Sequence, residues 1–216
     1  MLCMSDTVVC FDLDDTLYKE IDFVQSAYGE IAEKINHPEA VRQMMDWYRV
    51  GKNVFAELIS AYGSDLTVND CIQIYRNHFP KILLDSGTKE FLEELKDYGA
   101  LLGLITDGRS FSQRNKIKAL GLEGIFDIEV ISGELGSEKP DHRNYKVVMD
   151  RFPTHRNFLY VGDNPQKDFL APNQLGWKTF CLLDDGRNIH KQDFTLDVKY
   201  LPSYIIKSIS DLLNNL

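Results

Sequence analysis

Cysteine is scarce in this chain, and its four cysteines do not form a recognisable set. Cys3, Cys10, Cys71 and Cys181 lie far apart, with no C-x-x-C pair and no histidine at zinc-binding spacing. Two of them, Cys10 and Cys181, fall within apolar runs, where free thiols are usually buried. The cysteines therefore predict reduced thiols and no zinc site.

Long apolar runs are missing as well. No run approaches the roughly eighteen apolar residues of a membrane-spanning helix, and no cationic start precedes a stretch of signal-peptide character. We expect a soluble cytoplasmic protein that has no membrane partner.

Positive charge is in short supply. Lys and Arg total 24 against 33 Asp and Glu, which gives a net charge of −9, with a pI near 5.0. This balance argues against nonspecific binding of nucleic acid, which needs a cationic surface. It does not exclude a small anionic substrate, because a local pocket can be positive on an acidic protein. Whether the chain is a monomer or a dimer stays open.

Short apolar runs alternate with longer amphipathic segments over most of the 216 residues. The runs lack a strict polar alternation, which is typical of parallel strands buried on both faces. Strands are expected at Val8–Leu13, Leu101–Thr106, Ile128–Ser132, Phe158–Val161 and Thr179–Leu183. Helices are expected at Gly87–Tyr98, Phe111–Leu120, Asn144–Asp150, Pro165–Leu175 and Tyr204–Leu213. This order predicts an α/β fold with a doubly wound parallel sheet.

One region interrupts the alternation. From Ile21 to Phe79 the sequence shows three or four helical patterns and no convincing strand. We predict a helical cap over residues 19–81, inserted into an α/β core made of residues 1–18 and 82–216. We expect the cap above the carboxyl ends of the strands, where doubly wound folds bind ligands.

Three carboxylates follow the first expected strand, at Asp12, Asp14 and Asp15. Crowded carboxylates at a strand end repel one another unless they are neutralised, and Mg²⁺ prefers such oxygen ligands. An acidic turn that caps a helix is the simpler alternative. An EF-hand loop fails, because Leu17 stands where its glycine is required and Phe23 replaces its bidentate glutamate.

Three further strand ends carry polar groups. Thr106-Asp107-Gly108 offers a hydroxyl and a tight turn before a helix, which is a suitable seat for an anion. Lys139 precedes a proline, and Gly162-Asp163 is followed by Asp168. Each of these features is weak alone. Together they place groups useful for phosphoryl chemistry at one edge of a parallel sheet.

This combination resembles the haloacid dehalogenase superfamily of phosphoryl-transfer enzymes. The family's four motifs match, in order, Asp12-x-Asp14-x-Thr16-Leu17, then Thr106, then Lys139-Pro140, then Gly162-Asp163 with Asp168. The inserted helices resemble a cap of this family. The chain departs from many relatives at Asp107, where asparagine is common. We expect this carboxylate to point away from a bound phosphate or to pair with Arg109.

The resemblance implies that Asp12 is a nucleophile that forms an aspartyl-phosphate. It implies that Asp14 serves as general acid and then as general base, which requires a pKa close to the working range. Mg²⁺ would be bound by the carboxylates of Asp12 and Asp163 and by the backbone carbonyl of Asp14.

The other matched residues would serve the phosphoryl group. The resemblance implies that Thr106 and the backbone N–H groups of Leu13, Asp14 and Asp107 bind its oxygens. Lys139 would offset charge in the transition state. Asp168 would orient Lys139 or a metal-bound water, and Thr16 would support the site without touching substrate.

Hydrolysis of a small phosphomonoester, a nucleoside monophosphate or a sugar phosphate, is the expected activity. Asp14 argues against dehalogenation, which needs no general acid. A phosphomutase, a phosphonatase and a non-catalytic binding protein on the same fold stay open as alternatives.

Overall fold

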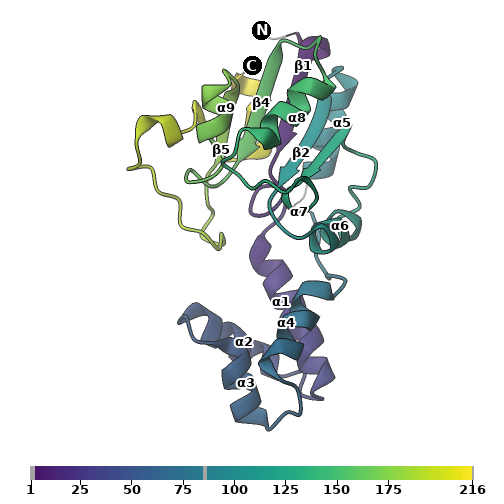
Figure 1. Cartoon of the computed structure of the whole chain (residues 1–216), viewed down its shortest axis with the longest axis vertical. Helices are drawn as coiled ribbons and strands as arrows, with labels where there is room; N and C mark the ends of the chain where they lie inside the picture. Colours follow the sequence, from purple (N-terminus) through teal and green to yellow (C-terminus); the bar gives the residue numbers. More distant parts are fainter. Residues whose placement is uncertain (1–2, 85–86, 216) are drawn as a thin grey trace. The chain divides into compact units, whose positions relative to one another are not determined.

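The structure is a computed structural model that describes residues 3–84 and 87–215. The chain divides into two compact units. The core unit consists of Met1–Glu20 and Leu83–Leu216, and the helical unit is Ile21–Ile82. Both are drawn in Figure 1, and each is described here by itself.

The core unit is built on a six-stranded sheet with the order β3-β2-β1-β4-β5-β6, in which every neighbouring pair is parallel. The strands are β1 (Thr7–Phe11), β2 (Leu101–Thr106), β3 (Ile128–Ile131), β4 (Asn157–Gly162), β5 (Lys178–Leu182) and β6 (Tyr204–Ile206). The five expected strands are confirmed within one or two residues at each end. The parallel sheet brings all their carboxyl ends to one edge.

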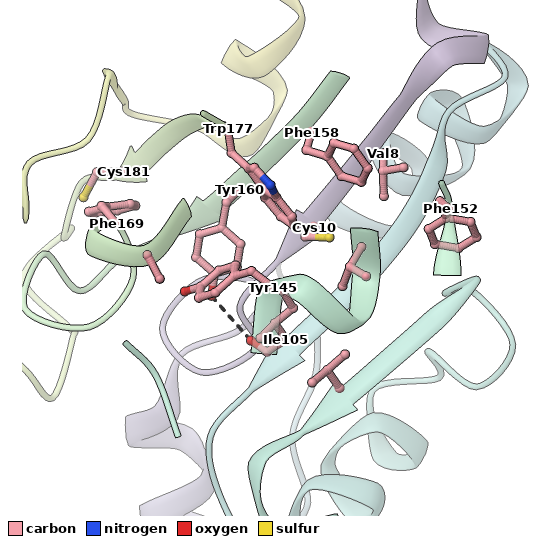
Figure 2. Close-up of a cluster of buried hydrophobic side chains, with 13 residues drawn as sticks. Val8, Cys10, Ile105, Tyr145, Phe152, Phe158, Tyr160, Phe169, Trp177 and Cys181 are labelled. Carbon is pink, nitrogen blue, oxygen red and sulfur yellow. Dashed lines mark hydrogen bonds between the residues drawn. The ribbon is translucent and has the colours of Figure 1, made fainter. Parts of the chain in front are cut away.

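Both faces of the sheet are covered. All five residues of β1 are buried, although successive side chains point to opposite faces. On one face, Val8 and Cys10 pack with Tyr145, Tyr160 and other aromatic side chains, as Figure 2 shows. Cys10 and Cys181 are buried free thiols, as expected.

Helices and turns connect the strands. The core unit holds η1 (Met4–Asp6), α5 (Thr88–Asp97), α6 (Ser110–Ala119), α7 (Ser132–Leu135), α8 (Arg143–Arg151), α9 (Leu170–Gln174), η2 (Val198–Tyr200) and η3 (Ile209–Asn215). The expected start of a helix at Pro165 is wrong, because α9 begins at Leu170. The intervening residues form a turn in which the N–H groups of Lys167 and Asp168 bond to the carbonyl of Asn164.

The expected helix over Tyr204–Leu213 is also wrong. Tyr204–Ile206 forms β6, which pairs with β5, and a 3-10 helix follows. Two isoleucines and a tyrosine in succession favour a strand, and the open edge of β5 supplies the hydrogen-bonding partner. The apolar periodicity of this segment predicts a helix, but its first three residues form a short edge strand.

The helical unit contains four helices: α1 (Glu20–Lys34), α2 (Ala40–Arg49), α3 (Val54–Tyr62) and α4 (Val68–Asn77). Asn53 caps α3, and Thr67 and Asp70 form a reciprocal capping box at the start of α4. Phe23 and Tyr28 of α1 contact the ring of Tyr75 inside this unit. In the described part of the chain, no helix has the length and hydropathy to cross a membrane.

Candidate active site

A cavity of about 160 Å³ opens at the carboxyl edge of the sheet, and all of its lining residues belong to the core unit. Its walls carry seven carboxylates, from Asp12, Asp14, Asp15, Glu20, Asp107, Asp163 and Asp168. Only two lysines, Lys139 and Lys167, face them in this lining. The lining of the cavity therefore carries many more carboxyl groups than cationic groups.

Lys139 is the buried cation at the centre of this site. Its Nζ lies 2.7 Å from Asp12 Oδ1 and 2.7 Å from Asp168 Oδ1, and it donates to the Tyr160 hydroxyl at 3.0 Å. Tyr160 also reaches the carbonyl of Ile105 inside the apolar cluster (Figure 2). The ammonium is thus held by two carboxylates and by a tyrosine anchored in the core.

The donor set fits a divalent metal. Oxygen atoms of Asp12, Asp163 and Asp168 lie within 4.8 Å of one another, and all three residues are buried. One ammonium, Lys139, cannot neutralise three buried carboxylates. Such a cluster of hard oxygen ligands suits Mg²⁺.

The hydrogen bonds indicate which oxygens are available to a metal. Asp168 uses Oδ1 for Lys139, and its Oδ2 accepts the N–H groups of Asp163 and Asn164 at 3.1 and 2.8 Å. Asp12 Oδ1 binds Lys139, and Asp163 Oδ2 accepts from Asn188, so within the described residues one oxygen of each has no hydrogen-bonding partner. These two oxygens suit a metal, whereas both oxygens of Asp168 are already used.

Burial shifts the proton affinities of the two ligands. Desolvation raises the pKa of Asp12 to about 7, although Lys139 opposes the shift. Desolvation, together with the charges of Asp168 and Asp12, raises the pKa of Asp163 to about 9. Near neutral pH the metal-free Asp163 therefore holds a proton, and Asp12 is partly protonated.

We predict that the affinity for Mg²⁺ rises with pH between about 6 and about 9, because these protons must leave before the carboxylates bind metal. Calorimetric titration in buffers of different ionisation enthalpy should show at least about one proton released per Mg²⁺ near pH 7. An affinity that is independent of pH, with no proton released, would contradict the assignment.

Asp14 does not join the metal cluster through its side chain. Lys116 Nζ lies 2.7 Å from its Oδ1, Gln113 Nε2 donates to its Oδ2 at 3.0 Å, and the Tyr18 hydroxyl donates to Oδ1. Burial alone raises the pKa of Asp14, but Lys116 and these hydrogen bonds outweigh it, and the pKa lies below its ordinary value. The expectation that the pKa of Asp14 lies near the working range is therefore wrong for the resting site.

Asp15 is satisfied in another way. Its Oδ1 accepts the N–H of Glu20 and its Oδ2 the N–H of Ile189, both at 2.9 Å. The three neighbouring carboxylates are thus neutralised separately, and only Asp12 belongs to the metal cluster. Thr16 is buried beside them, and within residues 3–84 and 87–215 its hydroxyl has no hydrogen-bonding partner.

Thr106 and Asp107 end β2 at the same edge. The Thr106 hydroxyl accepts from Gln113 Nε2 at 2.6 Å. Asp107 accepts the backbone N–H of Lys139 at 3.0 Å and pairs with Lys167 Nζ at 3.4 Å. The expected pairing with Arg109 is replaced by Lys167, which reaches Asp107 from the turn after β4.

The backbone N–H groups of Leu13, Asp14 and Asp107 are the donors expected to bind phosphoryl oxygens. Among the turn and loop hydrogen bonds of the described residues, none engages the N–H of Leu13 or Asp107. These groups are therefore available to an anion.

Sequence reasoning missed the loop after β5. Asn188 donates to Asp163 Oδ2 at 2.9 Å and accepts from Lys19 at 2.8 Å, and Gln192 donates to the carbonyl of Asp163 at 2.7 Å. The three N–H groups of Gly186, Arg187 and Asn188 converge on Asp184 Oδ1. The D-D-G sequence before Asn188 indicated a turn, but nothing in it pointed to Asp163.

The family follows from comparison with known sequences. Residues 9–182, which contain all four matched motifs, match the haloacid dehalogenase-like hydrolases. The chain belongs to this family. It is a phosphatase of the haloacid dehalogenase superfamily, with helices inserted between β1 and β2.

Two relatives and one solved structure are similar to the chain over nearly their whole length. The chain is 28% identical to a glyceraldehyde 3-phosphate phosphatase of Methanocaldococcus jannaschii, with 95% of each covered. It is 28% identical to the pyrophosphatase PpaX of Bacillus pumilus, with 95% of this chain and 94% of the relative covered. The hydrolase YfnB of Bacillus subtilis, solved bound to magnesium, shares the fold with a TM-score of 0.67 at 21% identity, with 97% and 98% covered.

Proposed function

We propose that this phosphatase hydrolyses a small sugar-type phosphomonoester through a phosphoryl group carried by Asp12. The main support is the arrangement around Asp12, a buried carboxylate with one oxygen on Lys139 and the other available beside Asp163. A nucleophile held in this way is close to both the cation and the metal cluster.

The first displacement transfers the phosphoryl group to Asp12. An Asp12 oxygen attacks phosphorus, and the bond to the leaving oxygen breaks. Asp14 supplies a proton to that oxygen, and it must take up this proton when the anionic substrate binds, because it is ionised and paired with Lys116 in the resting site. Thr106 and the N–H groups of Leu13 and Asp107 hold the phosphoryl oxygens, and Lys139 offsets their charge. In the second displacement, water attacks phosphorus while Asp14 takes a proton from it, the bond between phosphorus and the Asp12 oxygen breaks, and orthophosphate leaves.

Mg²⁺ would be held by the carboxylates of Asp12 and Asp163 and by the Asp14 carbonyl. When bound, it supplies charge neutralisation that lets the anionic phosphoryl group approach anionic Asp12. Asp168 and Asn188 contribute by fixing Lys139 and Asp163.

The names of the relatives favour a small substrate. Several are glyceraldehyde 3-phosphate phosphatases, and one is a ribulose-1,5-bisphosphate 5-phosphatase. A cavity of about 160 Å³ suits the phosphoryl end of such a molecule. We propose a short sugar phosphate, such as a triose phosphate, ahead of a nucleoside monophosphate.

A panel of phosphorylated compounds, assayed with Mg²⁺ and with EDTA, tests this function. Triose and other sugar phosphates should be hydrolysed faster than nucleoside monophosphates, and EDTA should abolish turnover. Preference for a nucleotide would contradict the substrate class. Transfer without release of phosphate would favour a phosphomutase, and activity confined to carbon–phosphorus bonds would favour a phosphonatase.

Asp14→Asn should slow the hydrolysis of substrates with poor leaving groups more than that of substrates with good leaving groups. The variant keeps its backbone carbonyl but cannot protonate the leaving oxygen, so hydrolysis of sugar phosphates should fall about 10²–10⁴-fold. Release of p-nitrophenolate in the first displacement needs no proton and should be much less affected, which a pre-steady-state burst can measure. Equal losses in the first displacement for both substrates would contradict a general-acid role.

A further inference from the structure

Gln113 is a buried polar residue that family motifs did not identify. It lies in the first turn of α6 and is only 1% exposed. A buried amide is costly unless its hydrogen-bonding groups are used. Its Nε2 lies 2.6 Å from Thr106 Oγ1 and 3.0 Å from Asp14 Oδ2, so one amide contacts both the threonine hydroxyl at the end of β2 and the Asp14 carboxylate.

The backbone leaves room for this side chain. A Cβ on Gly108 would lie 3.0 Å from Gln113 Cδ and 3.2 Å from its Oε1. The backbone of Gly108 has a φ of +143°, which side-chain-bearing residues rarely adopt. The absence of a Cβ at Gly108 thus leaves space for the Gln113 amide beside Thr106 and Asp14.

The partners fix the direction of each hydrogen bond. A carboxylate paired with Lys116 accepts hydrogen bonds and does not donate, so Gln113 presents its NH₂ group to Asp14. The second N–H of the same nitrogen points to Thr106 Oγ1, which must accept it. The hydrogen of the Thr106 hydroxyl is then left to donate elsewhere.

We propose that Gln113 is a positioning residue that turns the Thr106 hydroxyl into a donor toward the phosphoryl group. The inference rests on the proposed function, in which Thr106 binds a phosphoryl oxygen. A hydroxyl that is free to rotate would offer its lone pairs or its hydrogen to the anion. Because the Thr106 hydroxyl accepts from Gln113, it cannot turn its lone pairs toward the anion. Such preorganisation stabilises developing negative charge.

The test is a double-mutant cycle with the full chain in Mg²⁺, using inorganic orthovanadate as the probe. Gln113→Leu should weaken vanadate inhibition about tenfold, as expected for one lost orienting hydrogen bond. Thr106→Val should weaken it by at least as much. In the Thr106→Val background, Gln113→Leu should change the inhibition constant by less than about twofold.

Controls separate this role from folding. Lys118→Met, at an exposed position of α6, should leave vanadate inhibition unchanged. Should Gln113→Leu fail to fold, Gln113→Met keeps an unbranched side chain without the amide and should give the same result. Additive losses in the cycle, or an unchanged vanadate constant in a folded Gln113 variant, would overturn the proposal. Absence of phosphatase activity in the wild-type protein would instead contradict the proposed function.

Discussion

Asp12→Asn is expected to lower phosphatase turnover at least about 10³-fold. The substitution keeps the size of the side chain but removes the attacking oxygen's charge and a metal ligand. Stopped assays with p-nitrophenyl phosphate and with a triose phosphate should show the same loss, because both need the nucleophile.

The fold should survive this change. Lys139 retains its contact with Asp168 at 2.7 Å, and one of the clustered negative charges is removed. The midpoint of thermal unfolding should therefore not fall. Asp97→Asn, at an exposed position of α5, is a matched control that should change neither activity nor stability. Near-normal turnover by Asp12→Asn would refute nucleophilic catalysis at this residue.

Lys139→Met should damage both activity and stability. Turnover should fall at least about 10²-fold, because charge that develops on the phosphoryl group loses its buried cation. The free energy of unfolding without Mg²⁺ should fall by about 3–5 kcal/mol, since Asp12 and Asp168 are left buried without their partner. Urea unfolding in EDTA measures this loss.

The loss of stability in Lys139→Met should depend on pH and on Mg²⁺. Without Lys139, nothing opposes the burial that already raises the pKa of Asp12 above its value in the unfolded chain. The loss of stability is therefore largest above the folded pKa of Asp12 and shrinks as pH falls and Asp12 takes up a proton. Mg²⁺ should restore part of it. Lys167→Met, which removes a half-exposed lysine, should cost much less. A small loss for Lys139→Met would contradict its role as the central cation.

The position of the candidate site residues at one edge of the sheet was predictable because parallel topology constrains it. Asp12, Thr106 and Asp163 each follow or end a strand, and parallel strands bring their carboxyl ends to one edge. The D-x-D spacing did not reveal how each carboxylate is neutralised. Asp14 forms an ion pair with Lys116, which lies 102 positions away in the chain.

Other contacts of the site, and the short strand β6, could not be predicted from the sequence pattern. Gln113 and Lys116 lie in a strongly polar segment of α6, where solvent-facing and buried polar residues look alike. Asn188 lies in a loop without periodicity, and its contact with Asp163 depends on how that loop folds back. The β6 strand was misread because three residues are too few to show an alternation.

The most direct test of the mechanism is to trap the phosphoryl group on Asp12. The Asp14→Asn protein, given p-nitrophenyl phosphate and Mg²⁺, should complete the first displacement and hydrolyse the acyl phosphate slowly, because it lacks the general base. Quenching and borohydride reduction should then convert residue 12 to homoserine, which peptide mass spectrometry can locate. Homoserine at position 12, dependent on substrate, is the predicted result. Continued release of p-nitrophenolate with no reduction at position 12, or reduction at another carboxylate, would contradict it.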